Sequence, residues 1–159
     1  MDKNLIMLKD LVNWYNSLLL KDEGSMNVPI SDGKFTVKEI VAHLCRWDEY
    51  LINVGIPSLL ENAKIYFPNI NEYNQESAKL VKDTHFKEAI EKAIDLRNKL
   101  VELFIQNEQF SSKVISMNGQ TKNPQTNEPF TFYYLIEDFN EHDQHHVKQV
   151  ENFLYSLKS

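Results

Sequence analysis

Four segments of the chain repeat apolar residues at spacings of three and four, which is the pattern of a helix with one buried face. They lie at about residues 4–20, 36–55, 84–105 and 131–157. An apolar stripe of this kind has to be covered, and four stripes of similar length can cover one another around a shared core. The sequence therefore predicts an all-α protein with a four-helix bundle fold.

The second of these helices has recognisable signals at both ends. Thr36 and Glu39 stand in TVKE, a capping box in which each side chain satisfies a free backbone N–H at the start of a helix. Gly55 and Pro57 follow the last apolar residue of the stripe. Because Gly and Pro are typical of helix ends, we expect the second helix to stop there.

The connections between the predicted helices differ in length. Residues 21–35 form a short connector, and residues 107–130 form a longer, polar link. Residues 55–83 form a second long link, with one short helix expected at about 72–80. That link is long enough to run the length of a bundle, so the second and third helices need not be antiparallel neighbours.

Composition narrows the class of protein. With 159 residues, 42% of them hydrophobic, the chain can form one globular domain with its own core, which we assign to residues 1–159. The net charge is −6 and Lys and Arg form no stripe, so nucleic acid is not an expected partner. No apolar run approaches the roughly 20 residues of a membrane span, so no membrane association is expected. Cys45 is the one cysteine, which suits a reducing, cytoplasmic location.

Three of the five histidines lie in the last predicted helix, within LIEDFNEHDQHHVKQVENFL. His142 and His146 are four residues apart, so they share one face, and both interrupt the apolar stripe of that helix. His145 lies about 100° from His146, toward the flank. In the second helix, His43 stands at the edge of the apolar stripe, whereas Cys45 lies about 200° round the helix and cannot share a metal with it.

Two interpretations fit the paired histidines. In the first they are core residues, each hydrogen-bonded to a neighbouring helix or to water. In the second they share a divalent metal, since neutral imidazole binds zinc, nickel, copper and iron, and the i, i+4 spacing lets two rings reach one ion. An unsatisfied buried imidazole N–H costs about 1–3 kcal/mol, and one metal would satisfy both rings. If a metal is bound, its affinity should fall as pH drops through about 6.5, where free imidazole becomes protonated.

Two stretches of sequence resemble the DinB-like four-helix-bundle superfamily. GKFTVKEIVAHLCRWDEYL is similar to the signature of its second helix, whose histidine is a metal ligand, although many members have Trp where Phe35 stands. NEHDQHHVKQV is similar to the motif of its last helix, two histidines separated by three residues and followed by a glutamine. Residue by residue, the resemblance implies that His43, His142 and His146 are the metal ligands and that His145 is not. It also implies an up-down-down-up helix order and a homodimer.

Three histidines leave at least one position of a metal open, whereas a closed structural zinc site uses four protein ligands. An open site suggests an enzyme that acts on a small molecule, with zinc or nickel as the expected metal and iron or manganese as alternatives. DinB-like relatives include S-transferases that use low-molecular-weight thiols (bacillithiol, mycothiol or glutathione) and proteins described as hydrolases, so both reactions are implied. Two other functions stay open: a metal-binding sensor or sequestering protein without turnover, and a dimeric interaction module with structural histidines.

Three further polar residues of the last helix, Asp138, Asp143 and Gln149, bear on the chemistry of the histidines. Asp143 follows the first histidine of the pair, where a zinc protease of the HExxH class has glutamate, so that class is not expected. Asp138 either holds the second N–H of a ligating histidine or is solvated. Gln149 either orients His145 or His146 or packs in the bundle.

Aromatic residues near His43 also allow two interpretations. Trp47 and Tyr50 either line a substrate pocket or pack in the core. The segment YFPNINEY, in the first long link, is either a lid over the site or a surface crossover.

Overall fold

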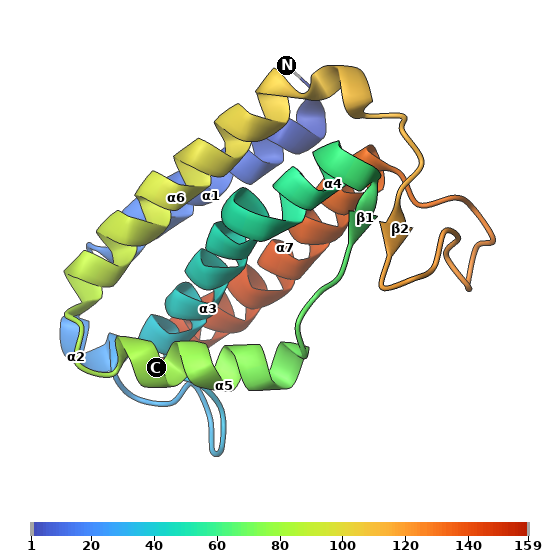
Figure 1. Cartoon of the computed structure of the whole chain (residues 1–159). Helices are drawn as coiled ribbons and strands as arrows, with labels where there is room; N and C mark the ends of the chain where they lie inside the picture. The colour runs from blue at the N-terminus through green and yellow to red at the C-terminus, as the bar shows by residue number, and fades with distance from the viewer. Residues whose placement is uncertain (1, 159) are drawn as a thin grey trace.

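The structure, a computed structural model, describes residues 2–158. Four long helices form a bundle: α1 (Lys3–Leu18), α3 (Val37–Tyr50), α6 (Phe86–Gln106) and α7 (Phe132–Ser156). The chain runs one way along α1, returns along α3, runs parallel to α3 along α6 and returns again along α7 (Figure 1). This is the up-down-down-up order, so the predicted fold class and helix order are confirmed.

Side-chain caps set where the long helices begin. The capping box of α3 is present, with Thr36 accepting from the Glu39 N–H at 3.0 Å and Glu39 accepting from the Thr36 N–H at 2.9 Å. At the start of α7, the Thr131 hydroxyl accepts from the Tyr134 N–H at 3.0 Å. Each cap satisfies backbone donors that have no partner within the helix.

The second helix does not end at Gly55 as predicted. It continues through a π-helical turn, Leu51–Gly55, into α4 (Ile56–Asn62). Pro57 falls in the first turn of α4, where a helix tolerates the missing N–H. The chain packs closely at Gly55, since a Cβ on it would lie 2.8 Å from Ile65 Cδ1 and the Ile65 side chain would have to shift. Gly55 and Pro57 therefore mark a change from α-helical to π-helical geometry and back, and not the end of the helix.

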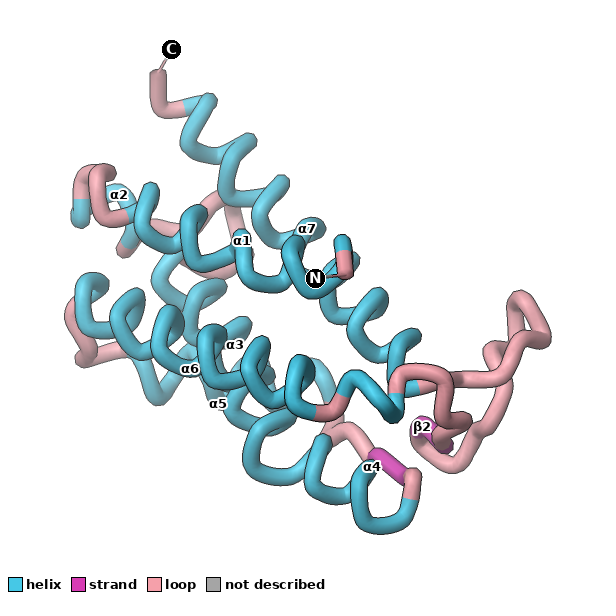
Figure 2. Tube along the Cα trace, turned by 90° about the horizontal axis from the view of Figure 1, so that it is seen from above, coloured by secondary structure: helices cyan, strands magenta, loops and turns pink. Residues whose placement is uncertain are grey.

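The two long links contain short elements and contact each other. The first holds β1 (Lys64–Ile65) and α5 (Ile70–Val81), which confirms the short helix predicted in that link. The second begins with a 3₁₀ turn (Glu108–Phe110) and holds β2 (Ser116–Met117), which pairs in parallel with β1. A further short helix, α2 (Glu23–Met26), follows α1. Seen from above, the loop around β2 projects beyond the helices (Figure 2).

Two large apolar clusters form most of the core, one toward each end of the bundle. The first includes Leu8, Trp47, Leu100 and Phe139, and the second includes Leu11, Leu44, Ala93 and Val150. Asp48, Arg97 and Asp143, all buried, lie at the level where the two clusters meet. The centre of the bundle is therefore a polar layer enclosed by apolar packing.

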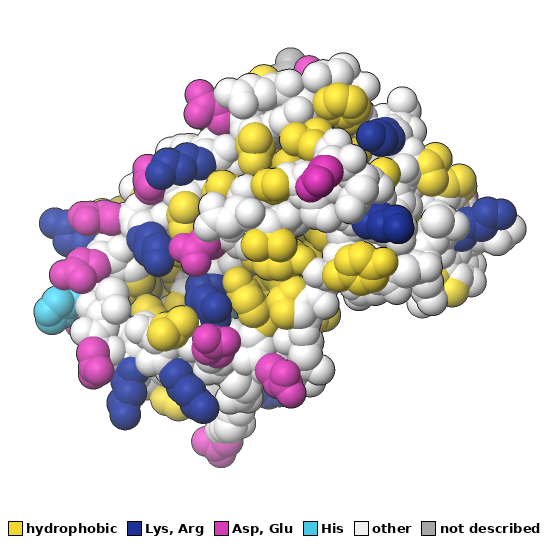
Figure 3. Space-filling model, in the orientation of Figure 1, with side chains coloured by type: hydrophobic (Ala, Val, Ile, Leu, Met, Phe, Trp, Pro, Cys, Tyr) yellow, Lys and Arg dark blue, Asp and Glu magenta, His cyan; other side chains and the backbone are white. Residues whose placement is uncertain are grey.

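The surface in the orientation of Figure 1 mixes charges of both signs, with apolar side chains gathered near its middle (Figure 3). Within residues 2–158, no helix combines the length and the apolar character needed to cross a membrane.

Candidate metal centre

The fold brings His43, His142 and His146 together. His43 comes from α3 and is buried, and the other two lie one turn apart on the facing side of α7. One ring nitrogen from each lies within 4.8 Å of the others, and the Nε2 atoms of His43 and His146 are 3.0 Å apart. His145 is exposed and outside this group, as expected from its angle on the helix. Cys45 is also outside it and lines a different cavity.

The donor set suits a divalent metal. Two nitrogens on one tetrahedral zinc ion lie about 3.3 Å apart, given bonds of about 2.0–2.1 Å, and the 3.0 Å between His43 Nε2 and His146 Nε2 is close to that separation. Gln149 Oε1 lies 2.9 Å from His146 Nδ1, so Nδ1 donates a proton and leaves the Nε2 lone pair free to face His43. His43 and His146 can hydrogen-bond to each other, but His142 would then have no hydrogen-bond partner among residues 2–158. A single ion would serve all three nitrogens at once. Of the two roles considered for Gln149, the structure shows the contact with His146.

Burial keeps the histidines neutral, which is the form that binds metal. Burial, followed by the neighbouring His146 and His142, lowers the pKa of His43 from 6.5 to about 2. Burial likewise lowers the pKa of His146 to about 4, and it lowers the pKa of His142. Competition between protons and metal should therefore begin well below pH 6.5, lower than the sequence alone suggests.

The depressed pKa values predict a pH-dependent stability of the metal-free protein. In the unfolded chain His43 takes up a proton below about pH 6.5, whereas in the folded chain it stays neutral, so acid favours unfolding. We expect the free energy of unfolding to fall between pH 6.5 and 5 by about 1.4 kcal/mol per pH unit from His43 alone. Urea denaturation with a chelator present, at pH 7 and pH 5, measures this. A His43→Leu variant should lose less stability on acidification, and an equal loss would contradict the assigned cause.

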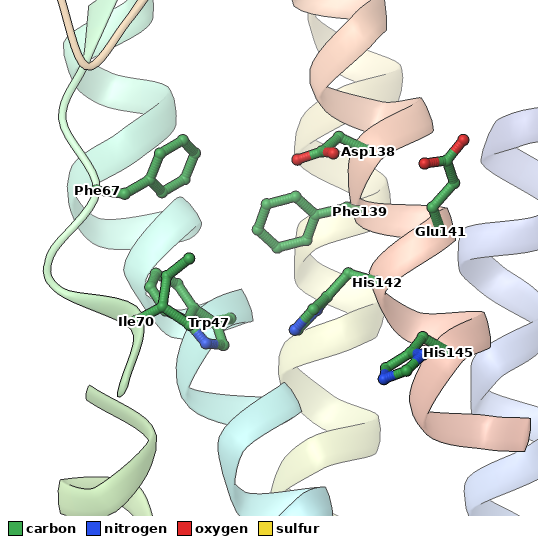
Figure 4. Close-up of a pocket in the computed structure, with 8 residues that line it drawn as sticks. All are labelled: Trp47, Phe67, Ile70, Asp138, Phe139, Glu141, His142 and His145. Atoms are coloured by element: carbon green, nitrogen blue, oxygen red, sulfur yellow. The ribbon is translucent and has the colours of Figure 1, made fainter. Parts of the chain in front are cut away.

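A cavity of about 410 Å³ opens beside the histidines. Its apolar wall consists of Trp47, Phe67, Ile70 and Phe139, and its polar groups are Asp138, Glu141, His142 and His145. In Figure 4, the side chain of His142 points from α7 toward Trp47 and Ile70 on the opposite wall. One of the three clustered imidazoles therefore faces a space large enough for a small organic molecule.

Trp47 has both of the roles considered for the two aromatic residues, whereas Tyr50 packs against the core and does not line the cavity. Trp47 belongs to the core, donating from Nε1 to Asn74 Oδ1 at 2.9 Å, and it also lines the cavity. Tyr50 packs edge-to-face against Trp47, and its hydroxyl donates a hydrogen bond to the Tyr66 carbonyl. The first long link is not only a surface crossover, because Phe67 forms part of the cavity wall.

Sequence reasoning missed an ion-pair network next to the histidines. Arg97 of α6 donates from Nε and Nη2 to both oxygens of Asp48 at 2.8 Å, and from Nη1 to Asp143 Oδ2 at 2.7 Å. Arg97 Nη1 also donates to the Leu8 carbonyl of α1 at 3.2 Å. The side chains of Arg97 and Asp48 are 0% exposed. One guanidinium therefore joins all four helices.

The network fixes the spacing of the two helices that carry the histidines. Asp48 lies five residues after His43 on α3, and Asp143 directly follows His142 on α7. Because one cation faces two carboxylates, a net negative charge is buried, and burial raises the pKa of Asp48 to about 6 against the opposing effect of Arg97. Since Asp143 is held by Arg97, it is not free to act as a base, which agrees with the absence of a protease motif.

The structure gives Asp138 neither of the two environments considered for it, a hydrogen bond to a histidine or full solvation. It lines the cavity, is half-buried, and makes no hydrogen bond or ion pair within residues 2–158. Burial, with a smaller effect from Glu141, raises its pKa. It is therefore neither a partner of an imidazole N–H nor a fully solvated side chain.

Comparison with known proteins shows the fold. No family model and no curated protein matches the sequence of this chain. A solved structure that it resembles is that of YfiT from Bacillus subtilis, described as a probable metal-dependent hydrolase with an unusual four-helix bundle topology. The likeness has a TM-score of 0.74 and covers 99% of this chain and 87% of that chain, at 17% sequence identity. The likeness confirms the expected four-helix bundle fold.

Proposed function

We propose that this protein is a divalent-metal-dependent hydrolase of small molecules, with His43, His142 and His146 as its metal ligands. The observation that carries the proposal is the convergence of three buried or half-buried imidazoles, one of which, His142, lines a cavity of about 410 Å³. The description of YfiT as a metal-dependent hydrolase supports the same reaction class.

The residues of the chain have separable tasks in this proposal. A divalent ion held by the three imidazoles would act as a Lewis acid and lower the pKa of a coordinated water or thiol. Gln149 keeps His146 in the tautomer whose Nε2 can bind that ion. Trp47, Phe67 and Phe139 bind the apolar part of a substrate and exclude water from it.

Transfer of a low-molecular-weight thiol is the second candidate reaction, because three histidines also leave room for a thiolate. The charges of the cavity argue against it. Bacillithiol, mycothiol and glutathione are polar, and the first and last carry carboxylates, whereas the charged lining residues in the described part of the chain are Asp138 and Glu141. Repulsion between like charges disfavours an anionic thiol there. Hydrolysis is therefore the reaction we propose.

The proposal is tested by metal content and by metal-dependent turnover. Elemental analysis of the purified protein should find about one divalent ion per chain, with zinc or nickel expected and iron or manganese as alternatives. A chelator should abolish hydrolysis of a panel of nitrophenyl esters and anilides, and added metal should restore it. Turnover that requires an added thiol would identify an S-transferase. Bound metal without any turnover would identify a sensor or storage protein, and the absence of metal would make the histidines structural.

A further inference from the structure

We propose that the cavity selects substrates that carry a positively charged amine, and that Asp138 is the residue that recognises the amine. The proposal rests on the proposed function only for the position of the reacting group, which would lie beside His142. It goes beyond that function by naming a substrate class and a specificity-determining residue.

The first observation is that Asp138 has a charge but no partner. Its side chain is half-buried in the cavity wall, and no Lys, Arg or hydrogen-bond donor pairs with it among residues 2–158. A carboxylate in that environment has lost part of its hydration without receiving a compensating contact. Burial accordingly raises its pKa. A cationic ligand would supply the missing partner.

The second observation is the nature of the opposite wall. Figure 4 places Phe67 across the cavity from Asp138, and Trp47 lower on the same side, across from His142. Phe67 and Trp47 lie close together, with ring centroids 6.2 Å apart. Aromatic faces attract cations, so these rings and the carboxylate favour the same kind of ligand. No cationic side chain contributes to the lining that the structure describes.

The third observation is the spacing along α7. Asp138 and His142 are four residues apart, so about 6 Å, slightly more than one helical turn, separates them along the helix axis. A ligand that reaches both would have a short apolar or aromatic body, an ammonium group at one end and its reacting group at the other. The geometry therefore favours small arylalkyl amines over long or anionic molecules.

Neighbouring acids provide matched controls. Glu137 precedes Asp138 on the same helix but is exposed and does not line the cavity. The carboxylate of Glu141 points away from Phe67 and Trp47 in Figure 4. Glu137→Gln and Asp138→Asn remove one negative charge each from adjacent positions, and only the second should change ligand preference.

The experiment compares three benzohydroxamates on the zinc-loaded protein by calorimetry, with a para aminomethyl, methyl or carboxyl group. The hydroxamate binds metal in all three, so the para group reports on the far end of the cavity. The aminomethyl probe should bind at least about tenfold more tightly than the methyl probe, and the carboxyl probe more weakly than either. Asp138→Asn should reduce the preference for the ammonium to within about twofold, and Glu137→Gln should leave it intact.

A second measurement does not need the metal. Benzylamine should shift the NMR signal of the Trp47 indole N–H in the wild type and not in Asp138→Asn, whereas benzyl alcohol should have little effect in either. If the hydroxamates fail to bind but benzylamine shows this pattern, the metal site is wrong and the amine site stands. Equal affinity for the three hydroxamates, or a preference lost equally in both variants, overturns the role of Asp138. So does the absence of any Trp47 shift with benzylamine.

Discussion

Replacing His142 with Ala should lower the affinity for zinc by more than about 100-fold, because the loss of a ligand costs more than the 10–100-fold typical of residues that only support one. His145→Ala, at a neighbouring position, should leave the affinity within about threefold, since His145 is exposed and outside the cluster of three imidazoles. Competition with a fluorescent zinc chelator at pH 7 measures both constants.

The pair of variants is a matched test of which face of α7 holds the metal. Both remove an imidazole from the same helix and from the lining of the same cavity. The His43→Ala variant tests the ligand from α3, and its loss of zinc affinity should be similar to that of His142→Ala. Equal losses from His142→Ala and His145→Ala would refute the assignment of the ligands.

Replacing Arg97 with Leu should destabilise the metal-free protein by about 3–5 kcal/mol, because it leaves two carboxylates buried without their cation. Lys92→Met is the control on the same helix. Lys92 pairs with Glu49 at 3.5 Å, but their side chains are 61% and 38% exposed to water, so loss of the pair should cost less than about 1 kcal/mol. Guanidinium denaturation of the two variants gives both free energies of unfolding.

A triple variant separates the charge effect from lost packing. Replacing Asp48, Arg97 and Asp143 together with apolar residues removes every buried charge of the network and should restore much of the stability lost in Arg97→Leu. If the triple variant were instead less stable than Arg97→Leu by the sum of three packing losses, the unpaired buried carboxylates would not be the cause of the destabilisation in Arg97→Leu.

The local pattern of the sequence predicted the helices and the histidine cluster well. Helical periodicity and the capping box depend on residues a few positions apart, and the pairing of His142 with His146 depends on one helical turn. His43 could be added because the resemblance to DinB-like proteins supplied a contact between distant parts of the chain.

The features that were missed depend on contacts across the fold. Arg97 stands four residues after Ala93, within the apolar stripe of α6, and its carboxylate partners lie more than 40 residues away on either side. An arginine at a core position was the available signal, but nothing local identifies which acids it meets. The strands β1 and β2 have two residues each, too few to show a period-two pattern.

The pairing of those two strands gives this architecture a way to diversify without altering its bundle. The Phe67 N–H donates to Asn118 Oδ1 at 2.8 Å, and the Asn118 N–H donates to the Ile65 carbonyl at 2.9 Å. An insertion or substitution in the surface loop around Asn118 would therefore be transmitted to Phe67 and reshape one side of the cavity. Natural variation could thereby retune ligand choice from a distant, permissive loop, while the histidines on α3 and α7 remained in place.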